Sequence, residues 1–183
     1  MAPDRRLPPA NIRLEILTDL VQGAQRGLSQ FVASLGHELS LDKASVLLSD
    51  QMPEGRIVAM LGYVGQLQGG LSLVLNEESF EVFFKALSGG FMEADLDNPI
   101  VVSAAGEMLN MIGGKMAIGL SERGYAMDLT PPQVFQGDTI RQAALPTNRR
   151  FILPYRIVGT GGKFFFTIMA LRQADDIENP PPL

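Results

Sequence analysis

The two side chains best suited to chemistry in this sequence are a carboxylate and a carboxamide, Glu107 and Asn110, one helical turn apart in the segment Ser103–Gly114. A carboxylate can pair with a cation, and a carboxamide can orient a water molecule without adding charge. At about 100° per residue, the large apolar side chains of this segment fall opposite Glu107. This apolar stripe consists of Ala105, Leu109, Ile112, Met116 and Leu120. The pattern predicts a helix that points both polar groups away from the core.

The outward face of this expected helix is poorly suited to water. Ser103, Asn110 and Gly114 lie on the Glu107 side, and the large apolar side chains of Met111 and Ile118 flank them. A glycine inside a helix costs about 1 kcal/mol relative to alanine. A helix with so few charges on its exposed side is expected to meet a partner there.

Length and composition predict one domain and exclude several classes of function. With 183 residues, 46% of them hydrophobic, the chain can bury one core and is too short for two domains of ordinary size. The net charge of −5 and the scattered basic residues exclude a nucleic-acid surface and a membrane-binding surface. No apolar run is long enough to cross a bilayer, and the start does not resemble a signal peptide. Without cysteine, a cytoplasmic location is expected.

The sequence contains a weak internal repeat. At a shift of 88 positions (Gly106 against Thr18), Thr18–Leu41 overlays Gly106–Leu129. The predicted organisation is a single domain over residues 11–172, built from repeats at about 11–88 and 98–172. Residues 1–10 are expected to form a flexible tail, and residues 173–183 a disordered one. The first repeat carries the polar residues Glu15, Asp19, Gln22, Arg26 and Gln30 where the second has its unusual face.

Each repeat is predicted to form a long helix followed by strands, an α/β (α+β) fold with two long helices packed on a mainly antiparallel six-stranded sheet. A shorter helix is expected from its cap at Asn76 to about Leu87, and Asp97–Pro99 is expected to open the Glu107 helix. Hairpin turns are expected at Gly65–Gly70 and Gly159–Gly162. The predicted strands are Glu38–Leu48, Ile57–Val64, Gly70–Leu75, Tyr125–Phe135, Phe151–Val158 and Phe164–Leu171.

Two other possible functional motifs lack residues that their chemistry requires. Gly159–Lys163 lacks the spacing and the hydroxyl residue of a phosphate-binding loop, so it is interpreted as a hairpin turn. His37 is the single histidine, and with no cysteine the chain has no complete set for a zinc site or a catalytic triad. We therefore expect no metal bound by this chain.

The pattern Ser-x-x-x-Glu-x-x-Asn-Met-Ile-x-Gly, formed by Ser103, Glu107, Asn110 and the residues after them, resembles the CheC/CheX/FliY family of bacterial chemotaxis phosphatases. A proline of the family pattern would correspond to Pro131 or Pro132, which fall one or two positions short. The similarity extends over nearly the whole chain except its tails. It includes Leu120–Tyr125, Gly70–Leu75 and Gly162–Phe166. A single Glu-x-x-Asn motif resembles CheX more than CheC, and a CheC-like pseudo-symmetric fold is implied.

This resemblance implies a protein phosphatase that hydrolyses the aspartyl phosphate of a CheY-like response regulator. Asn110 would position the attacking water, and Glu107 would anchor the receiver domain of the regulator by pairing with its active-site lysine. Ser103 would be a contact residue. Mg2+ is expected on the receiver. The docking rim would consist of Met111, Gly113, Gly114 and Ile118.

Three alternatives stay open at this stage. The chain could be a non-enzymatic adaptor or flagellar-switch-like module that binds a receiver domain without hydrolysis. A small-molecule hydrolase lacks a nucleophile–base pair here. Asp19 and Gln22 could form a degenerate second site, or inert scaffolding. A homodimer through the strand Phe164–Met169 is a further hypothesis. The sequence does not identify which response regulator is the substrate.

Overall fold

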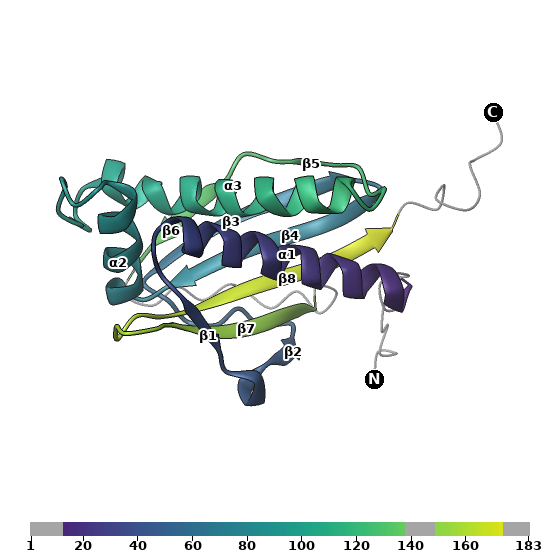
Figure 1. Cartoon of the computed structure of the whole chain (residues 1–183), viewed down its shortest axis with the longest axis horizontal. Helices are drawn as coiled ribbons and strands as arrows, with labels where there is room; N and C mark the ends of the chain where they lie inside the picture. Colours follow the sequence, from purple (N-terminus) through teal and green to yellow (C-terminus); the bar gives the residue numbers. More distant parts are fainter. Residues whose placement is uncertain (1–12, 138–148, 174–183) are drawn as a thin grey trace, which may run out of the picture.

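Two long helices lie side by side over one face of a sheet in the computed structural model, which describes residues 13–137 and 149–173 (Figure 1). The helix α1 spans Leu14–Ser34, α2 spans Glu77–Leu87 and α3 spans Pro99–Ser121. The expected tail 1–10 lies outside the described residues, as does the expected tail 173–183 apart from its first residue.

The helix ends follow the capping signals of the sequence. The side chain of Asn76 accepts a hydrogen bond from the Ser79 backbone N–H at 2.8 Å, and Asn98 does the same for Ile100 at 3.0 Å. Pro99 occupies the first turn of α3, where its missing N–H costs nothing. The predicted starts of α2 and α3 are therefore confirmed.

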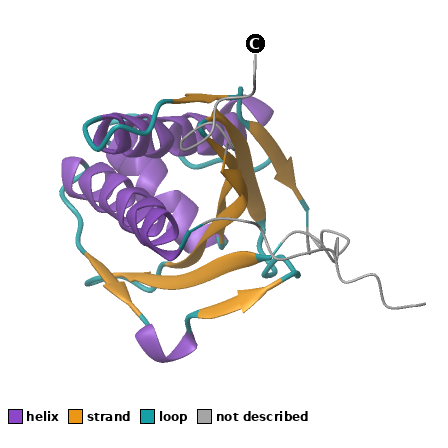
Figure 2. Ribbon diagram, turned by 90° about the vertical axis from the view of Figure 1, so that its right-hand side faces the viewer, coloured by secondary structure: helices purple, strands orange, loops and turns teal. Residues whose placement is uncertain are grey.

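The sheet is antiparallel throughout and has the strand order β1-β7-β8-β4-β3-β5, with β2 also paired to β7 and β6 to β3. All three helices lie on one side of it (Figure 2). Exchanging β1 with β5, β3 with β7 and β4 with β8 gives the same strand order read from the opposite edge of the sheet, as expected for an internal repeat. The strands are β1 (Leu39–Leu41), β2 (Leu47–Ser49), β3 (Ile57–Gly65), β4 (Leu67–Leu75), β5 (Met127–Leu129), β6 (Gln133–Gln136), β7 (Arg150–Ile157) and β8 (Lys163–Gln173).

The α/β architecture is confirmed, but the prediction of six strands is wrong because two expected strands are each broken in two. The segment Glu38–Leu48 is interrupted by a short 3-10 helix at Lys43–Ser45. Thr130–Pro132 separates β5 from β6, because proline cannot donate to the ladder. Both broken segments pair with a strand of the other half of the chain.

The turn predicted at Gly65–Gly70 is shorter than expected. It centres on Gln66, between the end of β3 and the start of β4, and Gly65 has a φ of +130°. Gly69 instead lies within β4, where a Cβ would stand 2.3 Å from the Tyr63 hydroxyl oxygen. That buried hydroxyl donates to the Met169 carbonyl oxygen at 2.7 Å. Glycine is therefore needed at position 69 for packing against Tyr63, and the turn does not require it. The hairpin turn at Gly159–Gly162 is confirmed.

The Phe-rich strand does not lie at an edge. β8 lies between β7 and β4, and Phe164, Phe166 and Ile168 are buried beneath the helices. The structure leaves β8 no free edge for pairing with a second copy, because both edges of this strand and its helix-facing residues are already used within the chain. The homodimer itself stays a hypothesis.

The core lies between the helices and the sheet. The predicted stripe of α3, from Ala105 to Leu120, is fully buried. On α1 the buried sector is wider than predicted: Leu17 and Val21 are half-buried, whereas Ile16 and Leu20 are fully buried. This follows because α1 packs against both α3 and the sheet.

Candidate functional site

The outward face of α3 presents its polar residues to solvent. Ser103, Glu107 and Asn110 are exposed, as their helical positions predict. Met111 and Ile118 are also exposed, at 41% and 65% of their surface. The helix thus carries a carboxylate and a carboxamide one turn apart on an exposed stripe whose other large side chains are apolar.

Glu107 and Asn110 make no hydrogen bond or ion pair with other residues in the described part of the chain. Ser103 differs, because its hydroxyl donates to the Ile100 carbonyl oxygen at 2.6 Å. The carboxylate and the carboxamide are therefore available to another molecule, whereas the serine hydroxyl already serves the first turn of its own helix.

Two adjacent glycines of α3 have opposite environments. A Cβ on Gly114 would have no heavy atom within 4 Å, so this position is open clearance beside Asn110. Gly113 is buried, and a Cβ there would lie 3.0 Å from Leu129 and 3.3 Å from Leu61. The expectation that Gly113 belongs to the exposed docking rim is wrong, because one residue rotates the position by about 100° towards the sheet.

The β5–β6 connection supports α3 next to Glu107. A Cβ on Gly106 would lie 3.0 Å from Val134 and 3.4 Å from Pro132. Of the two prolines that the sequence left open, Pro132 is the one against this helix position, and Pro131 is exposed. The strand segment therefore braces the helix at the residue before the carboxylate.

Ile100 is an exposed apolar residue of the same stripe that the sequence analysis missed. It is 77% exposed and lies about 20° around the helix from Glu107. The signal was its spacing of seven residues from Glu107, and extending the helical wheel to the first turn would have found it. The apolar rim thus continues to the N-terminal end of α3.

The carboxylate on the polar face of α1, Asp19, is held by contacts within the chain. Arg123 forms an ion pair with the Asp19 carboxylate, and the Tyr125 hydroxyl donates to its other oxygen at 3.3 Å. Burial and the nearby Asp19 charge raise the pKa of Tyr125. Gln22 and Arg26 are exposed on the same helix. The interpretation of this face as scaffolding fits better than a second site, because its carboxylate already has a cation.

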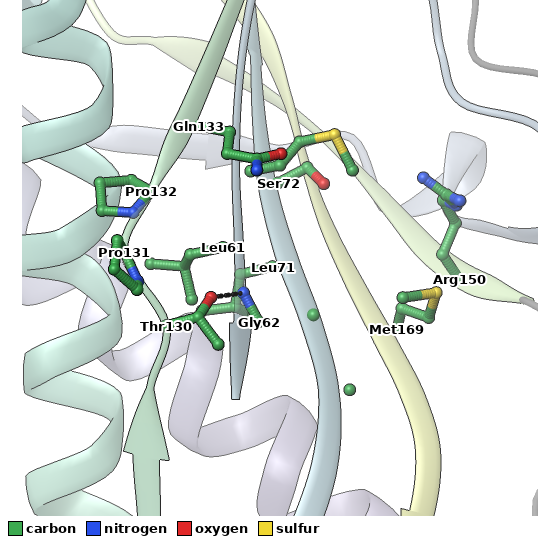
Figure 3. A pocket seen from close by; sticks show the side chains of 13 residues that line it. Leu61, Gly62, Leu71, Ser72, Thr130, Pro131, Pro132, Gln133, Arg150 and Met169 are labelled. Carbon is green, nitrogen blue, oxygen red and sulfur yellow. Dashed lines mark hydrogen bonds between the residues drawn. The ribbon is translucent and has the colours of Figure 1, made fainter. Parts of the chain in front are cut away.

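A hollow of about 460 Å³ lies on the sheet beside the β5–β6 connection (Figure 3). Pro131 and Pro132 separate the hollow from α3 (Figure 3). Neither Glu107 nor Asn110 lines it.

Two further properties of the described residues bear on function. None of their helices is both long and apolar enough to cross a membrane. Within the same residues, no group of three or more His, Cys, Asp or Glu side chains is arranged to hold a metal ion.

Comparison with known proteins decides the family. The family model described as chemotaxis phosphatase CheX matches residues 57–156, more than half of the chain. The CheY-P phosphatase CheX of Thermotoga maritima is 32% identical over 107 residues, which are 58% of this chain and 68% of the relative. This chain belongs to the CheX family. It is therefore a phosphatase of the chemotaxis class, a hydrolase.

Solved CheX structures share the fold. CheX from Vibrio vulnificus superposes with a TM-score of 0.69 at 21% identity, over 83% of this chain and 99% of that one. CheX in the complex CheX–CheY–BeF3–Mg2+ from Borrelia burgdorferi gives a TM-score of 0.64 at 17% identity, over 86% and 99% of the two chains. The CheC-like architecture expected from the sequence is thereby confirmed.

Proposed function

We propose that this CheX family member hydrolyses the aspartyl phosphate of a CheY-like response regulator, using Glu107 and Asn110 on α3. The observation that carries the proposal is the exposed carboxylate and carboxamide one turn apart, neither engaged by the described part of its own chain. The Thermotoga relative named a CheY-P phosphatase supports the substrate class.

Asn110 orients the attacking water in this proposal. An acyl phosphate is already activated, so hydrolysis requires little beyond a water molecule held in line with the leaving carboxylate. The amide oxygen of Asn110 accepts a hydrogen bond from that water. Because the amide is neutral, it adds no negative charge next to the phosphoryl group.

Glu107 anchors the receiver. A carboxylate beside a phosphoryl group is badly placed as a general base, since two anions repel each other. It is well placed to accept a charge-assisted hydrogen bond from a lysine of the receiver, which would fix the approach of Asn110 one turn later. Mg2+ is held by the receiver in this scheme, and the solved Borrelia complex, which contains CheX, CheY, BeF3 and Mg2+, supports this placement.

The apolar rim gives the receiver a surface to pack against. Ile100, Met111 and Ile118 line up along α3 with the polar pair between them. Gly114 leaves the backbone accessible beside Asn110. Ser103 is a peripheral contact, because its hydroxyl is already bonded to Ile100.

The test is phosphate release from a CheY receiver phosphorylated with acetyl phosphate, timed with the wild-type chain and with Asn110→Ala. We expect the variant to leave the spontaneous rate of the receiver unchanged while it still binds the receiver in a pull-down or titration. An Asn110→Ala protein that accelerates release like the wild type would rule out the proposed role of the amide. If the wild-type chain does not bind the receiver, a CheY-like receiver is ruled out as the partner.

A further inference from the structure

Two cations lie beside the proposed site, where α1 and α3 approach most closely. A Cβ on Gly27 would stand 2.7 Å from the Ile112 carbonyl oxygen and 3.0 Å from the Met116 backbone nitrogen. The neighbours of these contact residues are Arg26 on α1 and Lys115 on α3. The close backbone approach therefore brings the two basic residues to the same part of the helix layer, in which α1 and α3 run side by side (Figure 1).

Both cations are available to another molecule. Arg26 is exposed and Lys115 is half-buried. Neither has a hydrogen-bond or ion-pair partner among the residues that the structure describes. In contrast, Arg123 on the same helix layer is paired with Asp19, and Lys85 on α2 is paired with Glu81.

Lys115 borders the exposed stripe on the side of α1. It follows Glu107 by eight residues, which places it about 12 Å further along the helix axis and about 80° around it. Asn110 lies on the other side of the stripe, towards β5 and β6, because its neighbours on that side are Gly106 and Gly113. The screening length is about 30 Å at 0.01 M salt and about 10 Å at 0.1 M, so a charge about 12 Å from the site acts on an approaching partner at low salt and is largely screened at high salt.

The expected partner presents negative charge. A receiver that holds an aspartyl phosphate and Mg2+ must surround the metal with carboxylates, because Mg2+ is bound through carboxylate and phosphate oxygens. This chain itself has a net charge of −5, and Glu107 adds an anion at the centre of the site. The acidic site of the receiver therefore approaches a chain of net negative charge, and local positive charge favours that approach.

We infer that Lys115, assisted by Arg26, is a docking residue that attracts the acidic rim of the receiver's phosphorylation site. The inference rests on the proposed function and adds a determinant of association to it. Lys115 accelerates encounter and does not touch the reacting atoms. Its effect belongs in kcat/KM and in the dependence of that ratio on salt, while kcat stays constant.

The experiment measures kcat and KM for Lys115→Glu, Arg26→Glu and the double variant on phosphorylated CheY receiver, from 25 mM to 500 mM NaCl. We expect Lys115→Glu to lower kcat/KM about tenfold at low salt and about twofold or less at high salt, with kcat unchanged. Arg26→Glu gives a smaller loss. Lys163→Glu is the matched control, since Lys163 is an exposed lysine on β8 and carries the same charge change away from the helix layer.

Lys115 is half-buried, so Lys115→Gln accompanies the charge reversal and keeps most of the side-chain stem. Lys115→Arg is expected to retain the wild-type ratio. The inference is overturned by equal losses in Lys115→Glu and Lys163→Glu, by a loss that does not depend on salt, or by a fall in kcat alone. Asn110→Ala is assayed in parallel. If Asn110→Ala is active, the proposed function is overturned. If Asn110→Ala is inactive but Lys115→Glu has the same salt dependence of kcat/KM as the wild type, only this inference is overturned.

Discussion

The two long helices carry a carboxylate at corresponding positions, and the chain uses them in different ways. Asp19 on α1 and Glu107 on α3 correspond in the internal repeat. Arg123 and Tyr125 hold Asp19 within the molecule. In the repeat, the counterparts of these two partners are Leu35 and His37, so the first half supplies no matching cation for Glu107. One carboxylate ties the helix layer together, and the other has no partner among the described residues.

The residues around the two carboxylates also differ, because they are polar on α1 and small or apolar on α3. Arg26 on α1 corresponds to Gly114 on α3, and Gln30 corresponds to Ile118. A surface covered by polar side chains is well solvated, whereas one with an open glycine and an exposed isoleucine favours contact with another protein. The comparison teaches that a candidate binding face can be recognised by the polar side chains that it lacks relative to the corresponding helix face in the other repeat.

The comparison is tested most strongly by reversing the charge on α3. Glu107→Lys should reduce kcat/KM on the order of 10³-fold, because the proposed ion pair with a lysine of the receiver would become a repulsive pair of cations. The measurement is receiver dephosphorylation under subsaturating conditions. Asp19→Asn on α1 should leave kcat/KM unchanged. Equal losses in the two variants would show that Asp19 takes part in receiver binding as Glu107 does.

Exchanging the amides of the two helices tests the catalytic geometry. Asn110→Gln gives α3 the residue that α1 carries at Gln22. The extra methylene moves the amide by more than 1 Å, and kcat should fall about 10²-fold. The reverse change, Gln22→Asn, should give no second activity when it is combined with Asn110→Ala. Recovery of activity in that double variant would contradict the assignment of α1 as scaffolding.

Closing the clearance on α3 tests the docking rim. Gly114→Arg gives α3 the residue found at Arg26 and should raise KM about tenfold through lost close approach. The control is Gly119→Arg, because a Cβ at Gly119 also has no heavy atom within 4 Å, but this position lies about 120° around the helix from Glu107. Thermal melts should show both proteins folded. A similar KM in the two variants would remove Gly114 from the rim.

The smallest effect is expected on stability. Asp19→Asn removes the charge paired with Arg123, and both side chains are about one-third exposed. Such a pair contributes about 0.2–1 kcal/mol, so Tm should fall by about 1–3 °C. Differential scanning calorimetry measures the shift. The dephosphorylation rate at 25 °C should not change, and a marked loss would place Asp19 in function after all.

Much of the fold could be predicted because it rests on local signals. Asn76, Asn98 and Pro99 fix the starts of two helices through capping, which depends on a few adjacent residues. The strand breaks at Lys43–Ser45 and Thr130–Pro132 were missed. Such breaks depend on how each segment follows a partner strand from the other half of the chain, and periodicity within one segment carries no information about that.

The candidate site likewise has features that the sequence predicted and features that required the structure. The direction of Glu107 and Asn110 follows from helical spacing, since 100° per residue decides which side chains oppose an apolar stripe. The burial of Gly113 and the openness of Gly114 needed the positions of Leu129 and Leu61. The central place of β8 likewise needed the strand order, because a Phe-rich strand looks the same at an edge and in the middle of a sheet.

The sequence by itself determined the starts of α2 and α3, the apolar stripe of α3 and the two chemical groups on it, because these depend on residues within a few turns of one another. The tertiary structure alone decided that Asp19 is neutralised by Arg123 and that Glu107 is not. Ion pairing joins residues about a hundred positions apart, and it follows from how the antiparallel helices pack. Packing therefore separates a carboxylate that is paired within the fold from one that is unpaired among the described residues.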